Sequence, residues 1–276
     1  MLCSGTLPRS TTFAERVAAA TDAGFRGLSL WGRDYAGALA EGWSDSDMRS
    51  TLDDHGLAVA ELDPAWWWLP GADKVRIPPE YDSLDVFRFG EQEIFAMADA
   101  LGARSLNAVD VFGGAFTVEE AAQAFEALCI RASEHGLVVH LEWLTWSRIP
   151  NLETALKIVE LASVPNGGIT VDTWHLTRAD TDIEALRKVP GDLIRAIQLG
   201  DGPLLPEDDL MDAALHDRQL PGEGEFTLAG IVGALRETGT TAPLGVEVFS
   251  DSLHALGPHE AARRAASATR RVLQGV

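Results

Sequence analysis

The chain has 276 residues, and its 42 acidic against 22 basic side chains give a formal charge of −20. Because an anionic surface repels phosphate backbones and no Lys/Arg cluster offsets the charge, we expect no nucleic-acid partner. No apolar run reaches the roughly 20 residues of a membrane helix, and the first residues do not resemble a signal peptide. Two cysteines are too few for a disulfide framework. We therefore expect a cytoplasmic protein without a membrane partner.

Apolar runs of strand length alternate with segments of helical period along the whole chain. In chain order, strands are predicted at residues 2–7, 27–31, 58–62, 105–111, 138–141, 169–171, 194–199 and 244–248. The helices between and after them are predicted at residues 12–23, 44–55, 83–101, 117–135, 152–162, 183–188, 227–237 and 259–273. A long polar loop is predicted at residues 200–225.

These eight strand–helix pairs follow one another without a linker, which predicts one α/β domain over residues 1–276. Repeated βα units imply parallel strands with right-handed crossovers, and eight units close a (β/α)8 TIM barrel. The alternative is an open doubly wound sheet, which predicts a Gly-rich phosphate turn after an early strand. The first turn reads GTLPRSTT and lacks that fingerprint, so we favour the barrel.

Polar side chains occupy the ends of four strands in the second half of the chain. Glu142, Asp172 and Glu247 stand at the ends of apolar strands, and Gln198 lies within another. In a barrel, the carboxyl ends of the strands carry the active site, where three converging carboxylates need a cation or proton between them. Hard oxygen ligands suit Mn²⁺ or Mg²⁺ and also accept Co²⁺ or Zn²⁺. The pattern therefore predicts a divalent metal site formed by these four residues.

Two further motifs strengthen the pattern: DTWH at residues 172–175 and RQLPGEG at residues 218–224. With them, the chain resembles the xylose isomerase-like TIM barrel superfamily of sugar isomerases and epimerases over essentially its whole length. The most similar members are ketose 3-epimerases, hydroxypyruvate isomerase and inosose dehydratase. The resemblance implies that the strand-end residues hold one metal, while His175 and Arg218 contact substrate oxygens. Gln198 departs from the tagatose-type epimerases, which carry His there, and matches the hydroxypyruvate isomerase pattern.

The resemblance also implies a reaction, namely proton abstraction from a carbon next to a metal-bound carbonyl through an enediolate. Glu142 and Glu247 are the expected catalytic pair. We therefore expect a metal-dependent isomerase or epimerase of a small keto sugar or related polyol. Two alternatives stay open: a lyase that dehydrates an inosose or dehydroshikimate-like substrate on the same scaffold, and a non-catalytic sugar-binding barrel. The family further implies a carbohydrate-like substrate and a homo-oligomer.

Eight tryptophans are a further feature of the sequence, and several of them flank the predicted ligands. Indoles at a barrel mouth stack on sugar rings, or pack loops and subunit interfaces. We expect Trp66 and Trp174 to contact the substrate. His140 is expected to be a buried, hydrogen-bonded core residue. Asp201 is either a neighbour of the metal ligands or a turn residue, and the sequence leaves these two roles open.

Overall fold

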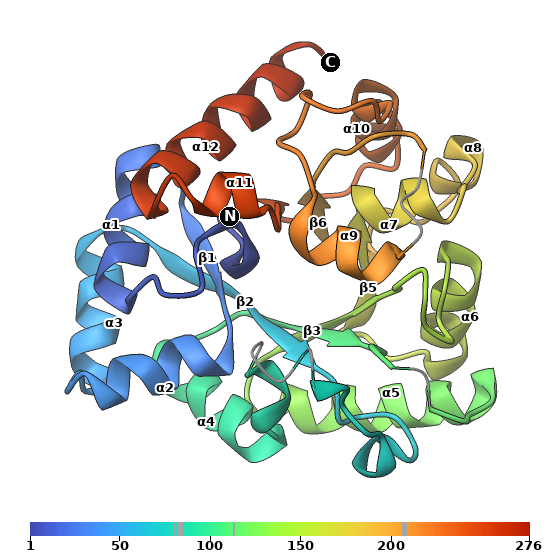
Figure 1. Ribbon diagram of the computed structural model, residues 1–276. Helices are drawn as coiled ribbons and strands as arrows, with labels where there is room; N and C mark the ends of the chain where they lie inside the picture. The colour runs from blue at the N-terminus through green and yellow to red at the C-terminus, as the bar shows by residue number, and fades with distance from the viewer. Residues whose placement is uncertain (80, 82–84, 113, 206–208) are drawn as a thin grey trace.

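The computed structural model describes residues 1–276 except 80, 82–84, 113 and 206–208. Within the described residues, seven parallel strands form one curled sheet in which each strand pairs with the next along the chain (Figure 1). The strands are β1 Gly27–Leu30, β2 Ala58–Ala65, β3 Ser105–Val109, β4 Val138–Glu142, β5 Gly167–Asp172, β6 Ile194–Leu199 and β7 Leu244–Val246. The parallel order confirms the predicted TIM barrel.

The eighth position of the barrel differs from the sequence prediction. Instead of a strand over residues 2–7, Leu2 alone bridges Leu28 of β1 and Val246 of β7, which closes the ring. The chain then turns into the short 3-10 helix η1 Ser4–Thr6. A Cβ on Gly5 would lie 2.3 Å from the Phe249 ring, so only glycine allows the turn to pack this closely.

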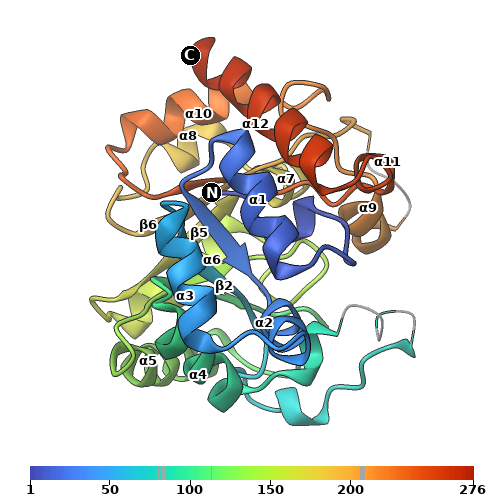
Figure 2. The same cartoon turned by 90° about the vertical axis from the view of Figure 1, so that its left-hand side faces the viewer.

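Helices cover the outside of the barrel, and α1 and α12 lie side by side (Figures 1 and 2). The longer ones are α1 Phe13–Ala23, α2 Gly32–Ala40, α3 Asp45–Asp54, α4 Glu91–Leu101, α5 Val118–Ser133, α6 Leu152–Ala162, α10 Leu228–Glu237 and α12 Pro258–Gln274. The shorter ones are η2 Ala72–Lys74, η4 Val86–Arg88, α7 Thr173–Arg178, α8 Ile183–Leu186, α9 Leu210–His216 and α11 Asp251–His254. Among the described helices, none combines the length and apolarity needed to span a membrane.

Local capping sets several of these boundaries. The Thr12 side chain accepts a hydrogen bond from Glu15 N, and Gly24 ends α1 in the left-handed region at φ 78°. Both features agree with the predicted helix at residues 12–23. In α4, the Glu93 carboxylate accepts from Gly90 N, so the helix begins at Glu91 rather than at residue 83. Residues 83–84 of that prediction lie outside the described residues.

The sequence analysis did not predict four of the described α-helices, of which the last in the chain is the short α11. The helix α2 precedes the predicted helix at residues 44–55, and α9 lies within the predicted polar loop 200–225. The third, α7, follows β5 without a loop, because the Asp172 carboxylate accepts from Trp174 N and caps it. This capping matters for the site, since it gives one predicted metal ligand a second, structural task.

Candidate active site

The four predicted metal ligands gather at the carboxyl ends of neighbouring strands. Glu142 ends β4, Asp172 ends β5, and Gln198 is the register partner of Asp172 on β6. Glu247 follows directly after β7, where its N–H donates to the Leu199 carbonyl over 2.9 Å. All four residues are at most 5 % exposed. The barrel therefore brings together residues that are up to 105 positions apart in the sequence.

Three of the buried groups at this end lie close enough to share one cation. One potential ligand atom each of Glu142, Asp172 and His175 falls within 4.8 Å of the others. His175 Nε2 is 3.9 Å from both Glu142 Oε1 and Asp172 Oδ2. His175 thus lies beside two of the predicted metal ligands, and its contact with a substrate oxygen stays a prediction. Glu247 lies outside this group of three.

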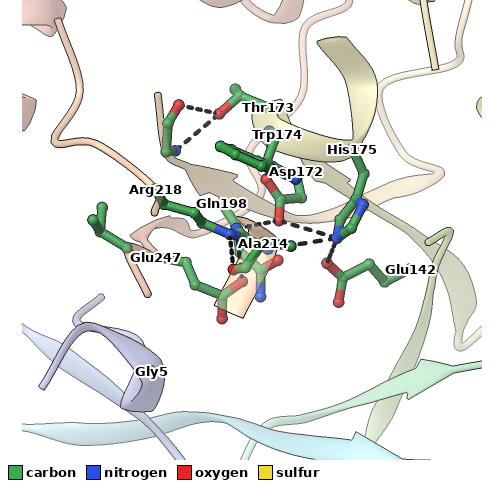
Figure 3. A network of polar contacts seen from close by, with 12 residues as sticks. Gly5, Glu142, Asp172, Thr173, Trp174, His175, Gln198, Ala214, Arg218 and Glu247 are labelled. Atoms are coloured by element: carbon green, nitrogen blue, oxygen red, sulfur yellow. Dashed lines mark hydrogen bonds and ion pairs between the residues drawn. The ribbon is translucent and has the colours of Figure 1, made fainter. Parts of the chain in front are cut away.

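Arg218 connects Glu247 to the rest of the site (Figure 3). Its Nη1 donates to Asp172 Oδ2 over 2.8 Å and to Glu247 Oε2 over 3.4 Å, and its Nε donates to the Ala214 carbonyl over 2.9 Å. The guanidinium is almost fully buried, so its positive charge acts in a region of low dielectric. It offsets part of the charge of the carboxylates that surround it.

Burial shifts the protonation equilibria of the site. It raises the pKa of Glu142 well above its usual range, to which the neighbouring Glu247 and Asp172 carboxylates add. The pKa of Glu247 rises to about 8, again chiefly through burial. Burial lowers the pKa of His175 to about 3, which keeps the imidazole neutral. Such shifts are expected where acids crowd together without a full complement of positive charge.

The residues present fit a divalent cation, and Gln198 gives the clearest test. Its Nε2 donates to Glu61 Oε1 over 3.4 Å, whereas its Oε1 has no hydrogen-bond partner within the described part of the chain. The side chain is fully buried, and leaving a buried acceptor unsatisfied costs about 1–3 kcal/mol. An amide oxygen beside carboxylates is a donor set that hard cations prefer. A cation at this position would supply the missing partner.

The sequence analysis did not predict a hydrogen-bonded group on β2 and β3. Asn107 Nδ2 donates to Glu142 Oε2 over 2.5 Å and to Asp63 Oδ1 over 3.0 Å. Trp31 Nε1 donates to Asp63 Oδ2 over 2.9 Å. The available signals were weak: Asn107 is one polar residue in an apolar strand, and Asp63 comes one position after the predicted strand 58–62.

Two other residues, His140 and Asp201, have structural roles. His140 is fully buried, and its ring contacts Ser105, Thr170 and Asn107. The Asp201 carboxylate accepts from three backbone N–H groups, those of Gly202, Gly222 and Phe226. Asp201 is therefore the turn residue of the two alternatives, since it fastens the loop that follows Arg218.

A cavity opens above these residues. Its polar lining comes from Asp63, Glu142, His175, Arg218 and Glu247. The rest of the wall is largely apolar, and its aromatic members are Trp31, Phe87, Trp146 and Phe249. A mostly apolar wall with a few convergent polar groups is the usual construction of a small-molecule site.

The two tryptophans expected to contact substrate do not line this cavity. Trp174 is fully buried, with its ring 4.4 Å from Arg178 Cζ and 5.4 Å from Arg218 Cζ. Trp66 borders a smaller neighbouring cavity, and its Nε1 donates to the Phe89 carbonyl over 3.1 Å. Trp31 and Trp146 line the larger cavity instead, because the loop paths after the strands decide which indoles reach the mouth. A substrate contact of Trp66 or Trp174 stays a prediction.

Together, the closed parallel barrel and the buried acids at its carboxyl face define a TIM-barrel protein with a candidate metal centre. The chain belongs to the xylose isomerase-like TIM barrel family, whose family model matches residues 17–272. This confirms the resemblance drawn from the strand-end residues and the two motifs.

Comparison with known proteins gives relatives of several activities. A 3-dehydroshikimate dehydratase of Pseudomonas putida is 28% identical over 265 residues, covering 91% of this chain and 37% of its own length. An inosose isomerase of Bacillus subtilis is 28% identical over 140 residues, covering 50% of this chain and 49% of its own. The chain thus spans about 37% of the length of the dehydratase.

Among solved structures, an IolI protein with a bound zinc atom superposes with a TM-score of 0.83. It is 18% identical, and the match covers 99% of this chain and 97% of that one. At this identity, the match shows a shared fold.

Proposed function

We propose that this chain binds one divalent cation through Glu142, Asp172, Gln198 and Glu247 and transfers a proton at a carbon next to a carbonyl. The substrate would be a small keto sugar or related polyol, and the reaction an isomerisation or epimerisation. The observation that carries the proposal is the position of Glu142 and Glu247. Both carboxylates line one cavity, and Gln198, the register partner of Asp172, has a buried amide oxygen for which the described residues supply no hydrogen-bond partner.

Each residue of the site has a separate task in this reaction. The four proposed ligands would hold Mn²⁺ or Mg²⁺, given their oxygen-rich donor set, and the bound cation would supply Lewis-acid stabilisation of negative charge on the substrate. Glu142 takes the proton, with its carboxylate held by Asn107 over 2.5 Å. Glu247 returns a proton from another strand. Arg218, which lines the cavity beside both acids, offsets negative charge and orients a substrate oxygen.

A second candidate is a dehydratase that begins with the same proton abstraction. The carbon–oxygen bond of the β-hydroxyl would then break, and the leaving oxygen would depart as water after protonation. Two observations favour it: the aromatic cavity wall suits the face of a carbon ring, and the relative that matches 91% of this chain is named a dehydratase. Product mass separates the candidates, since only dehydration removes one water.

The test uses the full chain loaded with Mn²⁺ in D2O. Keto sugars, an inosose and 3-dehydroshikimate are each followed by NMR for deuterium incorporation next to the carbonyl and by mass spectrometry for products. We expect Glu142→Gln and Glu247→Gln to lose exchange by at least about 100-fold, while the exposed Glu119→Gln retains it. Absence of exchange by the unaltered protein with all of these compounds would contradict the proposal and favour a non-catalytic barrel.

A further inference from the structure

We propose that Asp63 is a specificity-determining residue, which accepts a hydrogen bond from a substrate hydroxyl beyond the carbonyl and its adjacent hydroxyl. This inference rests on the proposed function and adds to it the chemistry of the substrate's far end. It is carried by the position of Asp63 in the cavity wall and by the donors that fix its carboxylate.

Asp63 lies on β2, and its carboxylate shares the Asn107 amide donor with Glu142. It lines the same cavity as Glu142 and Glu247 and is 9% exposed. The four residues proposed to hold the cation are Glu142, Asp172, Gln198 and Glu247, so Asp63 lines the cavity as an additional carboxylate.

The carboxylate of Asp63 is held in a fixed orientation. Trp31 Nε1 donates to Oδ2 over 2.9 Å, and Asn107 Nδ2 donates to Oδ1 over 3.0 Å. One donor on each oxygen prevents rotation about the last side-chain bond. A carboxylate offers about four lone-pair positions, so two remain for other donors. Because the residue lines the cavity, a bound molecule can use them.

The geometry also links Asp63 to the proposed base. The same Asn107 amide donates to Glu142, so a single side chain sets the distance between the two carboxylates. A substrate whose reacting carbon lies at Glu142 would extend its next oxygens along this bridge toward Asp63. That part of the cavity wall includes the Trp31 indole, which stacks on the Phe249 ring with 5.9 Å between the two ring centroids.

The chemistry of this contact restricts the substrate. A carboxylate that already holds two N–H donors accepts a hydrogen bond from a hydroxyl and repels a phosphate or a second carboxylate. The structure thus favours a substrate with a neutral hydroxyl at the β2 side. An anionic group, where the substrate has one, would lie toward Arg218 instead.

The experiment compares two probes in the Mg²⁺-loaded protein. Hydroxyacetone carries only the carbonyl and one adjacent hydroxyl, whereas erythrulose adds further hydroxyls. For each probe, deuterium exchange next to the carbonyl gives kcat/KM, and an NMR titration gives the dissociation constant. Both are measured for the unaltered chain, Asp63→Ala and Asp63→Asn. Metal affinity and thermal unfolding report whether each variant still folds.

We expect the unaltered chain to prefer erythrulose, and Asp63→Ala to reduce its binding and kcat/KM about 10- to 100-fold, the usual size of a hydrogen bond to a charged group. Hydroxyacetone should be unaffected, and Asp63→Asn should lie between, since the amide oxygen still accepts. Equal losses for both probes, or no preference in the unaltered chain, would overturn the inference. If neither probe exchanges deuterium, the proposed function fails for these ketones, and the binding measurements alone decide the role of Asp63.

Discussion

The Asn107 amide donates to both Glu142 and Asp63, over 2.5 and 3.0 Å, so one buried side chain orients two carboxylates of the cavity. Its carbonyl oxygen accepts from Thr170 Oγ1 over 3.1 Å, which fixes which end of the amide faces the acids. A supporting side chain whose own orientation is fixed keeps a reacting group within the small positional tolerance that catalysis requires.

Removing that donor tests its importance. We expect Asn107→Leu to lower kcat about 10- to 100-fold, because Glu142 loses its fixed orientation. KM should change less, since Asn107 does not line the cavity. Asn166→Leu is the matched control, because the Asn166 amide donates to the Cys129 and Leu137 carbonyls, far from the site. Equal kcat values for Asn107→Leu and the unaltered chain would contradict the positioning role.

Metal affinity should follow the donor set. We expect Glu142→Ala and Asp172→Ala to weaken Mn²⁺ binding at least about 100-fold, and Gln198→Ala to weaken it about 10-fold, since a neutral amide contributes less than a carboxylate. Isothermal titration after chelator treatment gives these affinities, with the surface variant Glu119→Ala as control. A Glu142→Ala protein that binds Mn²⁺ as tightly as the unaltered chain would refute the ligand assignment.

The loop after Arg218 should depend on Asp201. Asp201→Ala leaves three backbone N–H groups without their acceptor, and we expect it to lower the free energy of unfolding by about 2–4 kcal/mol. Gly224→Ala should act on the same contact, because a Cβ there would lie 2.4 Å from Asp201 Oδ1. Gly230→Ala is the control, with ordinary spacing of 3.4 Å to Ile183. Urea denaturation measures all three, and a stable Asp201→Ala protein would contradict the role.

Acid should destabilise the barrel through His140. Burial lowers the pKa of this histidine to about 3, from 6.5 for an unperturbed ring. Between these pH values the unfolded chain binds more protons than the folded one, so the free energy of unfolding falls as pH falls below about 6.5.

The effect of His140 is measurable by urea denaturation at pH 7.0 and 5.5. We expect the unaltered chain to lose about 1 kcal/mol more than His140→Gln over this interval. His55→Gln, which alters an exposed histidine, should lose as much as the unaltered chain. Identical pH dependence in the unaltered and His140→Gln proteins would show that His140 titrates normally in the folded state.

The sequence predicted the barrel because each strand is a short apolar run followed by a helical pattern, and such periodicity is a local property. The same logic located Glu142 and Asp172, which end their strands. Asp63 and Asn107 were missed because their importance lies in contacts across strands. The hydrogen-bond partner of a polar residue in an apolar strand cannot be predicted until the register of the neighbouring strands is known.

Loop residues were harder to predict for a related reason. Trp174 stands two positions after Asp172 in the sequence, but the short α7 helix capped by Asp172 turns it into the protein interior. Trp66 follows the predicted strand 58–62 and borders a separate cavity. Trp31 and Trp146 reach the cavity from other loops. Sequence proximity to a ligand is therefore a weaker guide than the path of the chain after the strand.

The bridge through Leu2 has a consequence for the order of folding. The hydrogen bonds that close the barrel join the first residues to β7, including Cys3 N to the Val246 carbonyl over 3.1 Å. Contacts of such large sequence separation form late and slow the folding of a chain. During synthesis, the barrel cannot close before Val246 has left the ribosome, because the closing hydrogen bonds need this residue. Glu247 is the next residue in the chain. The last acid of the proposed metal site thus arrives with the closing strand, so a partly made barrel lacks the complete binding site.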